Sequence, residues 1–127
     1  DNKEKEGVIS GGGFVIINAK ENIRASMIGT LASILSKSNG FKKGMFIMSL
    51  ARNLMEDTTK VSLRISGRNN DVDLREIIDR ITKIIPGSEA GGHKAAAGAM
   101  IPTEKEPEFI KEAKRVLNLD SIEEKIE

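Results

Sequence analysis

The sequence predicts a single α/β domain, in which a mixed central sheet of about four to five strands is flanked by about three helices. Three observations predict this fold class. Apolar runs of strand length alternate along the chain with apolar residues at helical spacing. The length of 127 residues and the 39% apolar content suit one domain with a buried core. No apolar run approaches the ~20 residues that a membrane-spanning helix needs.

The first part of the domain predicts a strand, a helix and a second strand. Residues 14–17 are a short apolar run, which is typical of a buried strand. Asn22 is a suitable N-terminal cap, and apolar residues at helical spacing follow it as far as Ser38. Residues 45–51 are nearly all apolar, as in a strand covered on both faces, and this favours some parallel pairing in the sheet.

Residues 60–66 alternate between apolar and polar side chains, as in a strand with one buried face. Arg64 lies on the polar face, and Arg68 joins it if the extended conformation continues. The connection at residues 54–59 is short enough for a hairpin. We therefore expect this strand to pair antiparallel with the one before it.

A clear helix follows. Asp73 and Glu76 resemble a capping box, and the Pro-Gly pair at residues 86–87 ends the apolar stripe. Residues 95–101 come after a glycine turn and predict a strand whose small side chains suit close packing.

The C-terminal part predicts one more main helix, with Pro107 in its first turn. Residues 120–121 are expected to start a short terminal helix. In this interpretation residues 1–7 are a flexible arm, and residues 8–127 form the domain.

Composition excludes several kinds of chemistry. Lys and Arg number 20 against 19 Asp and Glu, so net charge gives no general attraction to nucleic acid or anionic membranes. The absence of Cys excludes disulfides, thiolate metal sites and cysteine nucleophiles. A single His and no spaced carboxylate cluster argue against a metal centre.

The acidic pair Asp71 and Asp73 is explained by helix capping. Ser10, Ser66 and Ser88 lie near glycines but lack the strand–elbow–helix context of a nucleophile.

Residues 91–98, with the sequence GGHKAAAG, contain the only His. Paired glycines allow φ > 0 and the close approach of a ligand, and consecutive N–H groups in such a turn attract anions. Imidazole, ammonium and guanidinium groups add side-chain donors. Together with the polar face of residues 60–68, one helix away in the sequence, this segment predicts a phosphate site. The candidate residues are Arg64, Ser66, Arg68, Gly91, Gly92, His93 and Lys94.

Each of these features also has a structural interpretation. The glycine pair can be a simple turn, His93 a surface or structural His, and Arg64 a cover for the sheet through its aliphatic stem. The glycines at residues 11–13 lack the Lys and Ser/Thr of a P-loop and are interpreted as a hinge. The lysines at residues 42–43 are interpreted as part of a solvated turn.

Three motifs resemble one known family. Residues 91–98 are similar to the Gly-Gly-His-x-x-Ala-Ala-Gly signature of the DHH-associated C-terminal domain, which is found in DHH-family phosphoesterases. Residues 66–68 (SGR) match an element of RecJ-type exonucleases, and residues 28–35 (IGTLASIL) resemble a helix of the same enzymes. Order and spacing agree for all three, and the resemblance covers residues 8–117.

The resemblance implies a fragment of a larger cytoplasmic hydrolase, closest to archaeal RecJ-like single-strand exonucleases. In this family a DHH domain of the same polypeptide holds two Mn²⁺ or Mg²⁺ ions, and the C-terminal domain grips the substrate phosphate across a cleft. His93 and its glycines would then lie by the phosphate, while Ser66 and Arg68 would hold a neighbouring phosphate or the terminal nucleotide. The implied partners are single-stranded nucleic acid or a nucleotide phosphate, and no membrane. The chain alone is expected to lack metal ligands and catalytic residues.

Departures from the family pattern leave alternatives open. Bacterial RecJ-type sequences usually place a His shortly before the Ile-Gly pair, where this chain has RASM at residues 24–27, and often continue SGR with Ser, where it has Asn69. The choice between DNA and RNA therefore stays open.

A phosphoesterase of the same superfamily that acts on small nucleotides or oligonucleotides is one alternative function. A protein–protein interaction module without phosphate recognition is another. Four Phe and no Trp or Tyr favour the gripping of a strand end over a base-stacking platform.

Overall fold

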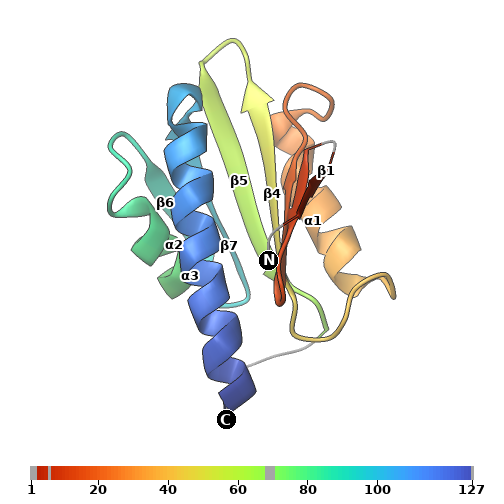
Figure 1. Ribbon diagram of the computed structural model, residues 1–127. Coiled ribbons are helices and arrows are strands. Elements are labelled where there is room, and N and C mark those ends of the chain that lie inside the picture. The colour runs from red at the N-terminus through yellow and green to blue at the C-terminus, as the bar shows by residue number, and fades with distance from the viewer. Residues whose placement is uncertain (1–2, 6, 68–70, 127) are drawn as a thin grey trace.

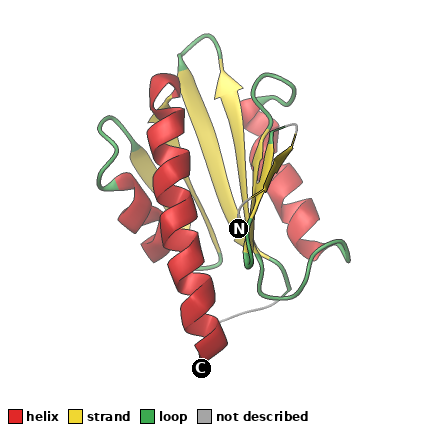
Figure 2. Ribbon diagram, viewed as in Figure 1, coloured by secondary structure: helices red, strands yellow, loops and turns green. Residues whose placement is uncertain are grey.

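The computed structural model describes residues 3–5, 7–67 and 71–126, with side chains for 7–67 and 71–120. These residues form one mixed sheet flanked by α-helices, which confirms the predicted α/β class (Figures 1 and 2). The strands are β1 (Lys3–Lys5), β2 (Val8–Ser10), β3 (Phe14–Asn18), β4 (Phe46–Asn53), β5 (Thr58–Ile65), β6 (Glu89–His93) and β7 (Ala96–Pro102). The helices are α1 (Ile28–Lys37), α2 (Leu74–Thr82) and α3 (Glu106–Ile126), with 3₁₀ turns η1 (Ala25–Met27) and η2 (Thr103–Lys105) before α1 and α3.

Within the described residues the sheet has seven strands in the order β1-β2-β3-β4-β5-β7-β6, which is more than the four to five that the sequence predicts. Two of the additional strands, β1 and β2, are only three residues long, too short for an alternating pattern to stand out. The strand β1 falls within the expected arm at residues 1–7. The third, β6, contains the glycine pair, and glycines weaken the pattern of a strand.

The strands β3 and β4 pair in parallel, with Phe14 opposite Phe46, and the other five pairs of the described sheet are antiparallel. A parallel pair needs a crossover connection, which α1 supplies. The predicted hairpin between β4 and β5 is confirmed.

Beyond β5, the chain passes through α2 to the outer strand β6 and then returns as β7, between β6 and β5. In this register Gly98 of β7 lies opposite both Ser62 of β5 and Gly91 of β6. The topology therefore places the glycine segment beside the polar face of β5.

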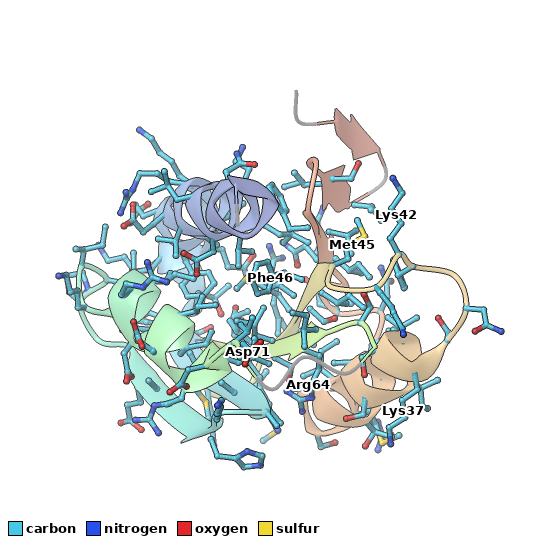
Figure 3. The ribbon with its side chains drawn as sticks, turned by 90° about the horizontal axis from the view of Figure 1, so that it is seen from below. Lys37, Lys42, Met45, Phe46, Arg64 and Asp71 are labelled. Atoms are coloured by element: carbon cyan, nitrogen blue, oxygen red, sulfur yellow. The ribbon has the colours of Figure 1, made fainter. Side chains whose placement is uncertain are left out.

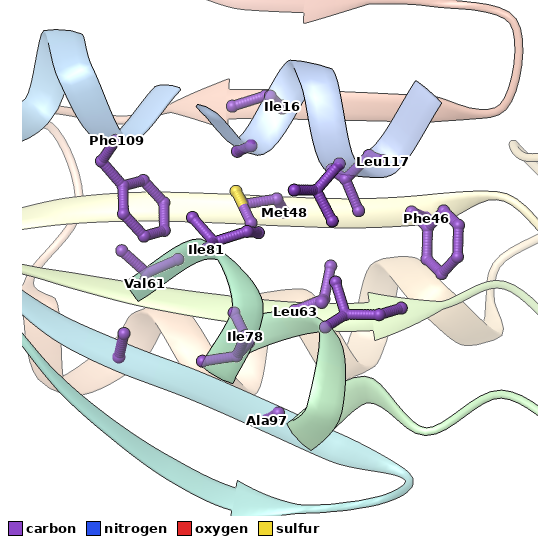
Figure 4. Close-up of a cluster of buried hydrophobic side chains, with 14 of the residues drawn as sticks. Ile16, Phe46, Met48, Val61, Leu63, Ile78, Ile81, Ala97, Phe109 and Leu117 are labelled. Carbon is purple, nitrogen blue, oxygen red and sulfur yellow. The ribbon is translucent and has the colours of Figure 1, made fainter. Parts of the chain in front are cut away.

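The helices lie on opposite faces of the sheet. In Figure 1, α2 and α3 lie on one side and α1 on the other. The main core lies between the sheet and the pair α2 and α3, and α1 covers a smaller cluster of Ala19, Ile28 and Ala51. Because α1 packs against β4 and β5, while α2 packs against β6 and β7 from the other face, no described helix packs closely on the α1 face of β6 and β7. Figure 4 shows the main core, which includes Ile16, Phe46, Met48, Val61, Leu63, Ile78, Ile81, Ala97, Phe109 and Leu117.

The predicted helix boundaries are correct in part. Asp73 caps α2, because its side chain accepts a hydrogen bond from the Glu76 N–H at 3.2 Å. Asn22, in contrast, caps no helix: α1 begins through η1, and the backbone N–H of Asn22 is bonded to the Ala19 carbonyl. The separate terminal helix expected at residues 120–121 is also wrong, since α3 continues unbroken through that position.

Across the described residues, no helix is both long and apolar enough to cross a bilayer.

Candidate functional site

The glycine pair lies at the end of β6, and its two members have different roles. Gly92 has a φ of +93°, and a side chain there would overlap the Ala96 carbonyl oxygen. This position therefore requires glycine. Gly91 has no positive φ, and a Cβ built on it meets no heavy atom within 4 Å. The absence of a side chain at Gly91 keeps the sheet surface open above it.

The turn that follows the pair is held against α2. The Lys94 carbonyl accepts a hydrogen bond from the Leu74 N–H at 2.9 Å, and the Gly92 carbonyl accepts one from Arg75 Nη1 at 3.2 Å. His93 and Lys94 are both exposed, and His93 Nδ1 accepts a hydrogen bond from the Ala95 N–H at 3.2 Å. The turn is thus fixed by the chain, with the Lys94 ammonium left at the surface.

Arg64 is the centre of the site. Its Nη1 donates to the carbonyls of Leu63 at 2.9 Å and Ala97 at 3.2 Å, and its Nε lies 3.4 Å from Ser33 Oγ. Burial lowers the pKa of the guanidinium, but an Arg remains charged at neutral pH. Among the described residues Arg64 has no carboxylate partner, and its Nη2 donates to no protein acceptor. The half-buried charge is therefore uncompensated by the described part of the chain.

Two hollows meet at Arg64. The sheet hollow, of about 390 Å³, lies on the α1 face of β5, β7 and β6, with Gly29 of α1 on its wall. The end hollow, of about 740 Å³, lies between the C-terminal end of α1, the loop before β4 and the turn between β6 and β7. Figure 3, viewed toward this end of the molecule, shows Arg64 beside α1 and Lys37 on the last turn of that helix.

The end hollow is basic. The cationic residues that line it are Arg64, Lys37, Lys43 and Lys94, and none of its described lining residues is acidic. Cations gathered around one cavity repel each other, and an anion bound between them relieves that repulsion. Guanidinium and ammonium groups are also the side chains that bind phosphate oxygens best. The end hollow is therefore suited to a phosphate group.

The structure brings together some of the predicted site residues but not all of them. Arg64 and Lys94 line the end hollow, while Gly91 and Gly92 line the sheet hollow together with Arg64. His93 is the last residue of β6 and lines neither hollow.

The remaining predicted residues lie in the segment after β5. Ser66 is buried: its hydroxyl donates to the Lys42 carbonyl and accepts from the Met45 N–H at 2.9 Å. It thus holds the loop before β4 in place. Gly67 has a φ of +71° and lines the end hollow, where the stem of Lys43 packs against it. Arg68 lies outside the described residues.

Sequence reasoning missed several lining residues. Lys43 was interpreted as part of a solvated turn, yet it lines the end hollow. Lys60 lies on the same face of β5 as Arg64, because side chains two residues apart on a strand share a face. The alternation of residues 60–66 already indicated this position. Glu89 and Lys37 had no such signal, because their positions depend on how β6 and α1 pack.

Within the described ranges, no group of three or more His, Cys, Asp or Glu side chains could hold a metal ion. The Mn²⁺ or Mg²⁺ ions implied by the resemblance therefore have no ligand set in the described part of this chain. The site described above offers donors for an anion.

The DHHA1 domain model matches residues 11–119. The chain belongs to the DHHA1 domain family. DHHA1 domains are associated with DHH-family phosphoesterases, and the match includes both the glycine segment and Arg64.

Solved structures share the fold of this DHHA1 domain. The C-Ala domain of Aquifex aeolicus alanyl-tRNA synthetase superposes with a TM-score of 0.66 at 21% identity, covering 87% of this chain and 96% of that one. A DHH-domain member of the S1p family of ribosomal proteins gives 0.57 at 23% identity, covering 82% and 25%. PggH, a pGpG-specific phosphodiesterase from Vibrio cholerae, gives 0.55 at 14% identity, covering 94% and 36%.

The chain thus spans almost all of the C-Ala structure but only a quarter to about a third of the other two. At these identities the likeness concerns the fold. A comparison with curated protein sequences gives no significant match.

Proposed function

We propose that this DHHA1 domain binds the phosphate end of a substrate for a manganese-dependent DHH phosphoesterase, of the archaeal RecJ-like single-strand exonuclease type. In this proposal a DHH domain of the same polypeptide holds the metal ions, and the enzyme acts in the cytoplasm on single-stranded nucleic acid. The present domain supplies no catalytic residue; it grips the phosphate opposite the metals.

The observation that carries the proposal is the Arg64 guanidinium at the junction of two hollows, which has no carboxylate partner among the described residues. Three lysines line the end hollow around it, and no described carboxylate does. A half-buried charge without a counter-charge is unfavourable, so the arrangement is explained by an anionic ligand. The net charge of +1 shows that this is a local concentration of cations in a chain with no general excess of them.

The RecJ-like assignment rests on the motifs at residues 28–35 and 66–68. Gly29, in the first of them, faces Arg64: a Cβ at this position would lie 3.7 Å from Arg64 Nη2 and 3.7 Å from Ser62 Oγ. The small residue thus leaves room beside the guanidinium. The helix motif and the phosphate site are in this way parts of one arrangement.

Hydrolysis of short nucleotides is a second candidate function. The sheet hollow, at about 390 Å³, is small enough for a single nucleotide, and PggH of the same fold is described as specific for pGpG. Both candidates require the same phosphate site, and they differ in the length of the substrate.

Binding of a 5′-phosphorylated single-stranded oligonucleotide tests the proposal. We expect it to bind about tenfold more tightly than the same oligonucleotide with a 5′-hydroxyl, as measured by fluorescence anisotropy, because charged hydrogen bonds contribute that much. Lys94→Ala should remove most of this preference, since Lys94 lines the end hollow.

Lys111→Ala is the matched control. Lys111 is an exposed residue of α3, on the opposite face of the sheet, and its loss should leave the preference unchanged. Equal affinity for the two oligonucleotides would contradict phosphate recognition and favour the interaction-module alternative.

A further inference from the structure

The sheet hollow differs in charge from the end hollow, and this difference gives a direction to any ligand that spans both. Glu89 lines the sheet hollow away from Arg64, whereas no described acidic residue lines the end hollow. A carboxylate repels phosphate and accepts hydrogen bonds only. The Glu89 part of the hollow is therefore unsuited to phosphate and suited to a group with N–H donors.

Register places Glu89 in a row with two other lining residues. Met100 of β7 lies opposite Glu89 on one side and opposite Lys60 of β5 on the other. Neither Glu89 nor Lys60 forms an ion pair within the described part of the chain. An acceptor and a cationic donor therefore flank the exposed Met100 side chain.

The floor between this row and Arg64 is made of two glycines, with Ser62 of β5 beside them. Gly98 and Gly91 are paired with each other, and both line the hollow. Bare backbone lets a flat ring approach closely. Lys60 and Arg64 are four residues apart on one strand, or about 13 Å along it. This separation is comparable to the length of a nucleotide from its phosphate to the far edge of its base.

We propose that the sheet hollow is a guanine pocket, in which Glu89 accepts hydrogen bonds from N1–H and the N2 amino group while Lys60 donates to O6. This inference rests on the proposed function, since the phosphate at Arg64 fixes which end of the nucleotide enters the hollow. Guanine presents an acceptor beside two donors on one edge, and Lys60 and Glu89 can reach these groups from the two sides of Met100. Adenine presents the reverse pattern, with an amino group toward Lys60 and the N1 acceptor toward Glu89.

Nucleoside monophosphates that differ by single groups test the pocket on the 127-residue chain. By isothermal titration, GMP should bind about tenfold more tightly than IMP, which lacks the N2 amino group, because one charged hydrogen bond is lost. AMP should bind more weakly than either. Equal affinity for GMP, IMP and AMP would overturn the pocket.

Two variants locate the selectivity. Glu89→Gln leaves a single acceptor and removes the charge, so GMP affinity should fall to the level of IMP. Gly91→Leu places a side chain in open space above the floor, so it should weaken the binding of GMP. Glu104 is also exposed and lines neither hollow, so Glu104→Gln should leave the binding of GMP and IMP unchanged. If Glu89→Gln keeps the full preference for GMP over IMP, Glu89 does not read the base.

Ribose 5-phosphate separates the two proposals. Suppose that ribose 5-phosphate binds, that Lys94→Ala lowers its affinity, and that GMP and IMP bind with equal affinity. The phosphate site is then supported, and the guanine pocket is wrong. If neither ribose 5-phosphate nor any of the nucleotides binds at millimolar concentration, the proposed function fails and the pocket fails with it.

Discussion

The carboxylate of Glu106 connects the last helix of the domain to three of its strands. This residue begins α3, is only 4% exposed, and accepts hydrogen bonds from Arg52 Nε and Nη2, both at 2.9 Å, and from Thr59 Oγ1. Asn18 Nδ2 adds another at 3.2 Å. These partners come from the ends of β3, β4 and β5, so one carboxylate joins three strands to the last helix. Its negative charge also suits the N-terminus of a helix.

The Glu106 cluster predicts a specific pH dependence. Burial alone would raise the pKa of Glu106, but hydrogen bonds from Arg52, Thr59 and Asn18 hold that pKa below its ordinary value. Because the pKa of Glu106 is lower in the folded protein than in the unfolded protein, the ionised side chain stabilises the fold at every pH above the unfolded-state pKa. This stabilisation is lost as the pH falls through the folded-state pKa. We expect Glu106→Gln to cost about 3 kcal/mol in the free energy of unfolding at pH 7. The loss should be smaller at pH 3, below the ordinary pKa of a Glu, because the lowered pKa of Glu106 contributes less to stability there. Urea unfolding at the two pH values measures both quantities.

Glu108→Gln is the control for this prediction. Glu108 lies on the same helix, and its ion pair with Lys105, at 3.5 Å, is exposed. Exposed pairs contribute about 0–1 kcal/mol, so this variant should unfold almost like the parent protein. A Glu106→Gln loss that is equally large at pH 3 would show that packing, and not the charge, holds the cluster.

At the scale of one residue, the sequence shows repeating patterns and local motifs such as the Asp73 cap of α2. The alternation of residues 60–66 correctly placed Arg64 on the polar face of β5. No such pattern joins Glu106 to Arg52 and Asn18, because these residues are distant in the sequence and meet only when the strands and α3 pack. Ser66 was predicted as a ligand from its motif, and the structure uses its hydroxyl to hold the loop before β4.

Among the elements, β5 and β7 approach each other closely at Gly98. A Cβ on Gly98 would overlap the Val61 carbonyl oxygen of β5, and its other near neighbours are also backbone atoms of Val61 and Ser62. Backbone atoms within a sheet cannot move aside as a flexible side chain does. The two strands can therefore approach this closely only because residue 98 is glycine.

Gly98→Ala and Gly91→Ala form a matched pair that tests this contact. Gly98→Ala should destabilise the domain by about 2 kcal/mol, because the added methyl group forces β5 and β7 apart. Gly91→Ala adds the same group in open space without a positive φ, so its stability should stay within about 1 kcal/mol of the parent. Thermal unfolding of the two variants gives the comparison. Equal melting temperatures would show that the strands can separate without cost.

The elements that the sequence predicted share strong local signals. The strands β4 and β5 are eight residues each, and α2 has a side-chain cap and a regular apolar stripe. The strand β6 was missed because its glycines are typical of a turn, and its extended form depends on pairing with β7. The strands β1 and β2 were missed because three residues are too few to show a period.

For the molecule as a whole, the two faces of the sheet differ in how far helices cover them, and this difference decides where a ligand can bind. The helices α2 and α3 cover one face of the sheet, and α1 covers only part of the other (Figure 1). Both hollows lie beside α1 and meet at Arg64. The sequence predicted that the Arg64 strand and the glycine segment would meet. It could not predict that α1 would leave room beside them, because this depends on the position of a whole helix over the sheet.

The same arrangement predicts how binding depends on salt and on substrate length. The net charge of +1 gives little long-range attraction, and the cations of the site are gathered around one hollow. If they contact about two to four phosphates, the slope of log K against log salt concentration should be about −1 to −3 for single strands. Affinity should rise from one nucleotide to a few and then stay constant up to long oligonucleotides, because only the strand end is held. Anisotropy titrations across a length series at several salt concentrations measure both quantities. A steeper slope, with affinity that continues to rise with length, would show instead that the domain coats a strand along its surface.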